Sequence, residues 1–277
     1  MPKKQDVDSI IYASYIIPVV PAGIVLTNHA IVIDNEKILS ILPEGDCKSH
    51  FSSPRTHTFN SHVIMPGLIN AHGHAAMTLF RGLADDLPLM TWLNDHIWPA
   101  EGKWVSEEFV YDGTRLAIAE MLRSGTSCFS DMYFFPNVSA KVAAEHKIRT
   151  QICFPILDFP TAWAQNAEEY IHKGVELFDQ YRNSDYVTVA FGPRAPCTVS
   201  DELLKQVATL SEQLHAQIQI HLHETAFEVQ ESIDQYGVRP IQRLSDLGLL
   251  SPSLQCVHMT QLNDDDISLI ADSRAHV

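Results

Sequence analysis

From Gly67 onward, segments with the composition of β-strands alternate with segments that have helical periodicity. The expected strands are Leu68–His72, Thr126–Asp131, Arg149–Leu157, Val187–Gly192, Ile218–His223 and Leu254–His258. This alternation predicts a parallel sheet with helical crossovers, either open or closed into a barrel. In barrel enzymes the reactive groups lie at the carboxyl ends of the strands, so those positions test the prediction.

The side chains at these strand ends belong to one chemical class. They are His72, His74, Asp131, Arg194, His221, His223, Glu224 and His258. Such groups bind metals and transfer protons, and no other part of the sequence concentrates them. The sequence therefore predicts an α/β protein with a metal-dependent TIM (β/α)8 barrel and an active site at the strand ends.

Residues 1–66 have a different pattern, which is mainly that of β structure. Ile10–Val19 is strand-like, and Ala30–Ile33 and Ile38–Leu42 flank a short polar turn, which predicts a hairpin. The polar stretch Gly45–Thr58 is expected to be a loop. We therefore predict a small β part ahead of the barrel.

The barrel part, residues 67–277, is shorter than the roughly 250 residues of a complete eight-stranded barrel. Six strands are expected, and Arg274–Val277 has the composition of a seventh that has just begun. No segment remains for an eighth strand. We therefore expect the barrel to be incomplete at its C-terminal side.

Several helix boundaries carry recognisable signals. Ser106, Ser200 and Asn263 each precede acidic residues that favour the first turn of a helix. Gly125 follows a helical pattern, at the position where a left-handed residue commonly ends a helix. These residues predict where three helices begin and where one ends.

Charge and cysteine content bear on the class of protein. The chain has 19 basic and 34 acidic residues, and its net charge of −15 disfavours a nucleic-acid partner. The N-terminus lacks the apolar core of a signal peptide, and no apolar run has the length of a membrane span. Five scattered cysteines without a Cys-x-x-Cys pair are typical of reduced thiols in a cytoplasmic protein. A homo-oligomer is left open.

His72 and His74 are two residues apart at the end of a strand, so both imidazoles can face one metal ion. A third histidine would complete the three-ligand arrangement of catalytic zinc, and no cysteine stands beside these histidines. Strand periodicity does not decide between His221 and His223 as that ligand. We therefore predict a catalytic divalent metal.

Two further residues have alternative interpretations. Glu224 is suited to be a general base beside a metal-bound water, or else an acid at the start of the helix that begins near Ala226. His258 is either a second proton-transfer group or a hydrogen-bonded core residue. The local pattern alone leaves both choices open.

The sequence motifs resemble those of the amidohydrolase superfamily. The run from Pro66 to Glu101, PGLINAHGHAAMTLFRGLADDLPLMTWLNDHIWPAE, is most similar to the branch of methylthioadenosine and S-adenosylhomocysteine deaminases. GTSCFSDMYFF, HLHETAFEV and CVHMT extend the resemblance over nearly the whole chain. It implies a TIM barrel flanked by a small β-sandwich, one divalent metal, most simply zinc, and hydrolytic deamination of an adenosine derivative with release of ammonia.

The resemblance also implies a role for individual residues. It makes His72, His74 and His221 the metal ligands, and it leaves His223 for packing or hydrogen bonding. Glu224 becomes the proton shuttle, and His258 helps to position the attacking water. Glu101 corresponds to the acid that binds the ribose hydroxyls.

Two departures from the family pattern affect these expectations. Arg194 stands within Pro-Arg-Ala-Pro where the family usually has histidine, so a permanently charged group faces the substrate. The family's fourth metal ligand, an aspartate on strand eight, is expected to be missing. Alternatives are another amidohydrolase reaction on an aromatic heterocycle, as in triazine chlorohydrolases or guanine deaminases, and an inactive truncated barrel. Glu101 favours a nucleoside over a triazine.

Overall fold

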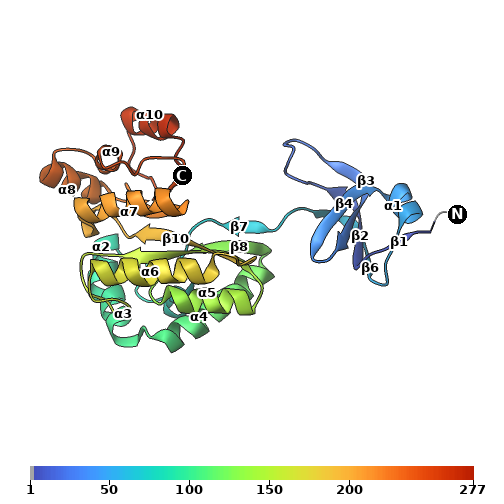
Figure 1. Ribbon diagram of the computed structural model, residues 1–277, viewed down its shortest axis with the longest axis horizontal. Helices are drawn as coiled ribbons and strands as arrows, with labels where there is room; N and C mark the ends of the chain where they lie inside the picture. Colours follow the sequence, from blue (N-terminus) through green and yellow to red (C-terminus); the bar gives the residue numbers. More distant parts are fainter. Residues whose placement is uncertain (1–2) are drawn as a thin grey trace. The chain divides into compact units, whose positions relative to one another are not determined.

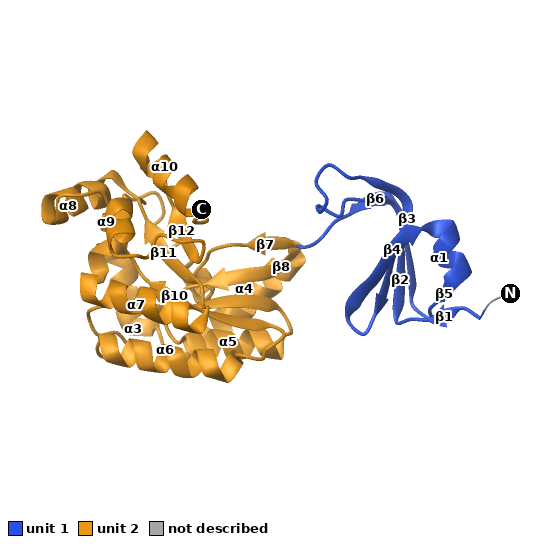
Figure 2. Cartoon of the chain, turned by 45° about the horizontal axis from the view of Figure 1, so that its top comes forward, with its two compact units in different colours: residues 1–67 blue, residues 68–277 orange. Residues whose placement is uncertain are grey.

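The computed structural model describes residues 3–277. The chain divides into two compact units, Met1–Gly67 and Leu68–Val277 (Figure 2). The first unit is mainly β structure, whereas strands and helices alternate in the second. No helix within residues 3–277 combines the length and the apolar character needed to cross a membrane.

The first unit is built on a four-stranded sheet in the order β4-β3-β2-β6. Its strands are β2 (Ser9–Ile16), β3 (Leu26–Asp34), β4 (Lys37–Pro43) and β6 (Thr56–Ile64). The predicted hairpin is confirmed as β3 and β4, which pair antiparallel. Asn35 and Glu36 join these strands with φ values of 51° and 62°, as a tight two-residue hairpin turn requires.

The predicted loop Gly45–Thr58 was wrong, because regular elements occupy much of it. Helix α1 (Glu44–His50) and the short strand β5 (Phe51–Ser52) lie there, and β5 pairs with β1 (Gln5–Asp6). The helix buries one side chain, Cys47. A single buried residue among polar ones gives no apolar periodicity, so the sequence pattern missed this helix.

The second unit contains a sheet of six parallel strands that follow one another in sequence order. They are β7 (Leu68–Asn70), β8 (Thr126–Asp131), β9 (Arg149–Ile156), β10 (Val187–Pro193), β11 (Ile218–Leu222) and β12 (Leu254–His258). Every predicted strand overlaps one of these. The predicted α/β class is confirmed, with six strands in a part of a barrel.

Helices separate these strands along the chain. They are η1 (Ala75–Phe80), α2 (Leu89–Trp92), η2 (Leu93–Ile97), α3 (Trp98–Trp104), α4 (Glu107–Arg123), α5 (Pro136–Glu145), α6 (Ala167–Tyr181), η3 (Pro196–Thr198), α7 (Asp201–Leu214), α8 (Ala226–Tyr236), α9 (Pro240–Asp246) and α10 (Asp264–Ser273). Helices α4 to α7 run along the sheet (Figure 1). An apolar core that includes Phe154, Phe191 and Leu204 forms with these helices. Polar side chains of the strands face the interior side of the curved sheet.

The expected helix boundaries are confirmed. Helices α4 and α10 begin after Ser106 and Asn263, whose side chains accept hydrogen bonds from backbone N–H groups of the first turn. Helix α7 begins after Ser200, and Gly125 follows α4 with a φ of 85°. His276 pairs in parallel with Gln255 of β12, which confirms the beginning of a seventh strand.

Candidate active site

Four histidines meet at the carboxyl edge of the six-stranded sheet. His72 and His74 follow β7, His221 lies in β11, and His258 ends β12. The ring centroid of His72 lies 4.9 Å from that of His74 and 4.7 Å from that of His221. The ligand nitrogens of His72, His221 and His258 all lie within 4.8 Å of one another, and the rings of His74 and His221 stack at 5.3 Å. Histidines predicted from three strand ends are thus neighbours in space.

Hydrogen bonds hold the Nδ1 atoms of three of these rings. His74 Nδ1 lies 2.5 Å from the carbonyl oxygen of Met132, and His221 Nδ1 lies 2.8 Å from that of Arg194. A carbonyl oxygen only accepts, so both Nδ1 atoms carry the proton and Nε2 keeps a lone pair. His72 Nδ1 lies 2.8 Å from the side-chain oxygen of Gln219.

The Nε2 atom of His72 is buried and finds no hydrogen-bond partner among residues 3–277. A buried polar atom without a partner is costly unless something else satisfies it. An imidazole held through Nδ1, with a free Nε2 directed at other imidazoles, is the usual state of a metal ligand. The donor set therefore fits a divalent metal that accepts nitrogen ligands.

Burial also keeps these imidazoles neutral. It lowers the pKa of His72, lowers that of His74 to about 4, and lowers that of His221 well below its ordinary value. The repulsion that would arise between two protonated neighbouring histidines lowers the pKa values of His74 and His221 further. At pH 7 all three rings are therefore in the unprotonated form that a metal requires.

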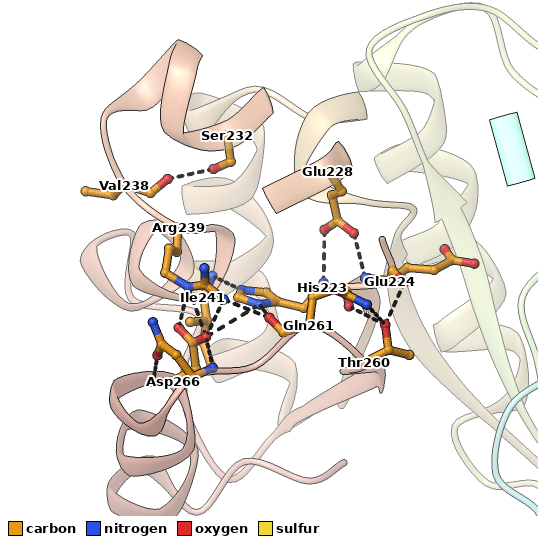
Figure 3. Close-up of polar contacts among 11 residues, drawn as sticks. His223, Glu224, Glu228, Ser232, Val238, Arg239, Ile241, Thr260, Gln261 and Asp266 are labelled. Carbon is orange, nitrogen blue, oxygen red and sulfur yellow. Dashed lines mark hydrogen bonds and ion pairs between the residues drawn. The ribbon is translucent and has the colours of Figure 1, made fainter. Parts of the chain in front are cut away.

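His221 and His223 differ in backbone conformation and in hydrogen bonding. His223 has a φ of 53°, so it leaves the alternation of the strand and its ring turns away from the cluster. Its Nε2 accepts a hydrogen bond from the N–H of Ile241 at 3.0 Å, and its Nδ1 lies 2.9 Å from the carbonyl of Gln261 (Figure 3). Both nitrogens are used, and no lone pair remains for a metal.

Glu224 lies beyond β11 with its carboxylate near the cluster. Its Oε1 lies 3.5 Å from Nε2 of His258. Its backbone carbonyl accepts a hydrogen bond from the hydroxyl of Thr260 at 2.7 Å, and its carboxylate extends away from these backbone contacts (Figure 3). Thr225, not Glu224, is the residue whose side chain caps α8. The helix-start interpretation of Glu224 therefore loses its support.

Glu228 is a residue of this region that the sequence analysis missed. Its carboxylate accepts hydrogen bonds from the N–H groups of His223, at 3.0 Å, and Glu224, at 2.7 Å (Figure 3). The sequence does carry a signal for Glu228, because Thr225 and Glu228 have the three-residue spacing of a helix capping box. Glu228 thus fixes the backbone on which Glu224 is placed.

A pocket adjoins the histidine cluster. It is lined by His74, Met77, Glu101, Met132, Tyr133, Phe134, Pro155, Arg194 and His221. Glu101 is only 8% exposed and accepts a hydrogen bond from the hydroxyl of Tyr133 at 2.8 Å. Burial raises the pKa of Glu101, while Tyr133 and the charge of Arg194 oppose that rise. The predicted residues Glu101 and Arg194 therefore share one pocket with two of the histidines.

Tyr133 and Asp131 complete the surroundings of the pocket. Tyr133 lies within a motif that the sequence analysis singled out, although its contact with Glu101 was not foreseen. Asp131 ends β8, is 2% exposed, and accepts a hydrogen bond from the N–H of Ala75 at 2.6 Å. It therefore fixes the turn after His74 and does not line the pocket.

Known proteins resemble this chain closely. A 5-methylthioadenosine/S-adenosylhomocysteine deaminase from Saccharophagus degradans is 56% identical over 277 residues, which are 100% of this chain and 62% of that protein. A crystal structure of an adenosine deaminase from Xanthomonas campestris with bound zinc has a TM-score of 0.97 and 46% identity. That match covers 99% of this chain and 62% of the other. An atrazine chlorohydrolase from Arthrobacter aurescens shares the fold, with 19% identity and a TM-score of 0.88. That match covers 97% of this chain and 65% of the other.

The chain thus spans about 62% of the length of these relatives. The family model described as Amidohydrolase family matches residues 63–277. This match takes in all four clustered histidines, Glu101, Arg194 and Glu224. The chain belongs to the amidohydrolase family.

Proposed function

We propose that the protein is a metal-dependent hydrolytic deaminase of adenosine derivatives, with 5′-methylthioadenosine and S-adenosylhomocysteine as substrates and ammonia as a product. The observation that carries this proposal is the cluster of neutral histidines beside a pocket that contains a buried carboxylate. The relative from Saccharophagus degradans, named as a deaminase of these compounds, supports it.

His72, His74 and His221 would hold one divalent metal, and we propose zinc. The unpartnered Nε2 of His72 supports this set, as does the zinc in the related structure from Xanthomonas campestris. When bound, zinc supplies a Lewis acid that lowers the pKa of a water molecule towards 7. His258, whose ring centroid is 5.3 Å from that of His221, would orient that water.

Glu224 would carry the protons of the reaction. Its carboxylate is 30% exposed and lies beside His258, so a water molecule near the histidines is within its reach. Deamination needs a proton to leave the attacking water, and the purine ring nitrogen and the departing amine each need one. A single carboxylate can serve these steps in turn.

Glu101 and Arg194 would bind the substrate. A buried carboxylate that faces a pocket needs hydrogen-bond donors for its oxygen atoms. Two neighbouring ribose hydroxyls provide such donors. A triazine or free guanine has no such pair of hydroxyls. Glu101 therefore favours a nucleoside over the alternative heterocycles.

The test is ammonia release by the protein as its gene encodes it, including any sequence that follows Val277. We expect release from methylthioadenosine, adenosylhomocysteine and adenosine, and a much higher KM for Glu101→Gln with these nucleosides. Release from guanine or a triazine, with none from the nucleosides, would replace this proposal with the alternative. A zinc-loaded protein that deaminates none of them would be an inactive barrel.

We further propose a cytoplasmic protein without a nucleic-acid partner. The net charge of −15 supports the absence of nucleic-acid binding. The free cysteines, of which Cys47, Cys153 and Cys256 are buried, support a reducing compartment. The assembly state, including a homo-oligomer, is a matter for sedimentation measurements.

A further inference from the structure

A layer of polar side chains lies on the interior side of the six-stranded sheet, next to the histidine cluster. Ser130 of β8, Gln151 of β9, Gln219 of β11 and Gln255 of β12 belong to it. The amides of Gln151 and Gln255 bond to each other at 2.8 and 3.2 Å. Gln219 is 1% exposed and is the member of this layer that contacts a histidine of the cluster.

The orientation of the Gln219 amide follows from its partners. Its Nε2 lies 3.1 Å from the backbone carbonyl of Ala71, 3.1 Å from Ser130 Oγ and 2.9 Å from Gln255 Oε1. The carbonyl of Ala71 is an acceptor in every case, so only the NH2 group of Gln219 can face it. The Oε1 of Gln219 therefore faces His72.

This orientation determines the tautomer of His72. Oε1 only accepts, and it lies 2.8 Å from His72 Nδ1. The proton of the neutral ring must therefore be on Nδ1, and the lone pair on the buried Nε2. The two other proposed ligands reach the same state through backbone carbonyls, which no substitution removes. Of the three proposed ligands, only His72 depends on a side chain for its tautomer.

We infer that Gln219 is a positioning residue for the metal site, which sets the tautomer and ring orientation of His72 through its amide. This inference rests on the proposed function, because it takes His72 to be a metal ligand. Gln219 does not line the pocket that contains Glu101 and Arg194. Its loss should therefore weaken metal binding without altering the groups that contact the substrate.

Zinc affinity of the 277-residue chain, measured by competition with a chelator, tests this role. Gln219→Met keeps the volume and removes the acceptor, and we expect about a 10–100-fold weaker affinity. Gln151→Met is the matched control, because Gln151 belongs to the same layer but its amide hydrogen-bonds to Ser130, Cys153 and Gln255 and to neither His72 nor Gln219. Equal losses in the two variants, or no loss in Gln219→Met, would overturn the inference.

Gln219→Glu separates the hydrogen bond from the side-chain shape. A carboxyl group of the same shape keeps an acceptor oxygen for His72, whether or not it is ionised. Zinc affinity should then lie closer to wild type than in Gln219→Met. A loss as large as that of Gln219→Met would contradict a role for the acceptor.

A measurement on the chain with Gln219 intact does not depend on whether the Gln219 variants fold. Nitrogen NMR of ¹⁵N-labelled histidine in the metal-free chain at pH 8 should show His72, assigned by its absence in His72→Ala, with the proton on Nδ1. A proton on Nε2 would overturn the inference. If His72→Ala keeps zinc, the assignment of His72 as a metal ligand is wrong. If His72→Ala loses zinc while Gln219→Met keeps it, only the role of Gln219 is wrong.

Discussion

Glu224 illustrates how strongly single residues near the site are constrained. The residue before it has a left-handed backbone, and its own N–H and carbonyl are held by Glu228 and Thr260. With the backbone fixed on both sides, the side chain starts from a defined point, and its carboxylate lies 3.5 Å from Nε2 of His258. A defined position is what a proton-transferring group needs, because proton transfer requires hydrogen-bond distance.

Replacing Glu224 with Gln should preserve the fold and the bound metal while lowering turnover by about 10²–10⁴-fold, because the amide cannot shuttle protons. Ammonia release and metal content are measured together. Glu202→Gln, which changes an exposed acid in the first turn of α7, is the control. Turnover of Glu224→Gln within about tenfold of wild type would remove Glu224 from the reaction.

Arg194 bears on the choice between substrates. The segment 157–163 after β9 carries no basic residue, and Pro155 is the residue of β9 that lines the pocket. A methylthio group suits such an apolar wall, whereas the carboxylate of adenosylhomocysteine would need a cation. We therefore predict a higher kcat/KM for methylthioadenosine. A higher value for adenosylhomocysteine that is lost in Arg194→Ala would contradict this preference and assign Arg194 as the carboxylate contact.

At the scale of elements, the loops after β11 and β12 are connected to α9 and α10 by one ion pair. Asp266, in the first turn of α10, accepts hydrogen bonds from Arg239 at 2.7–3.0 Å and from the N–H of Asn263 at 2.9 Å. Arg239 also donates to the carbonyl of Gln261, which holds the ring of His223 (Figure 3). The start of α10 is thus part of the support behind the site.

Asp266→Asn should lower the free energy of unfolding by about 2–4 kcal/mol, less than for a fully buried pair because Arg239 keeps 28% exposure. Burial raises the pKa of Asp266, but Arg239 and Asn263 outweigh it and hold that pKa below its ordinary value. The charged form is therefore favoured by folding. Its contribution is complete above about pH 4 and is lost as pH falls through the lower folded pKa.

Thermal and denaturant unfolding between pH 3 and pH 7 measures this contribution. The difference between wild type and Asp266→Asn should narrow below about pH 4. Asp265→Asn, at a neighbouring exposed position, should change stability little. A difference that stays constant with pH would mean that the Asp266 carboxylate does not provide the stabilisation.

Some elements could be predicted from the sequence more completely than others. Runs such as Arg149–Ile156 are long and β-branched or aromatic, so periodicity placed the strands well. Helix α1 was missed because only Cys47 faces the core. His221 and His223 could not be separated from their spacing, because a left-handed φ at His223 breaks the strand alternation. Gln219 gave no signal, since its partners lie on other strands.

For the whole second unit, the proposed metal would join distant parts of the chain. His72 follows β7 at one edge of the sheet, and β12 forms the other edge. His221 lies on β11, next to β12. A ligand shared by these positions binds the folded arrangement and not the unfolded chain, so it should stabilise the fold.

Zinc at about 100 times its dissociation constant should therefore add about 2.7 kcal/mol to the stability of the fold, and a chelator should remove that gain. Melting temperature with and without zinc is the measurement. The His72→Ala, His74→Ala double variant should lose activity, most bound metal and the response to zinc. Stoichiometric zinc retained by that variant would refute the ligand assignment.

Met132 and Arg194 each contribute to the site in two ways, one through the backbone and one through the side chain. The backbone carbonyl holds a histidine of the cluster, and the residue also lines the pocket. Every amino acid has that carbonyl, so a mutation at either position can reshape the pocket without releasing the histidine. A substitution at either position can therefore change which substrate fits the pocket while the histidines keep their hydrogen bonds and their place.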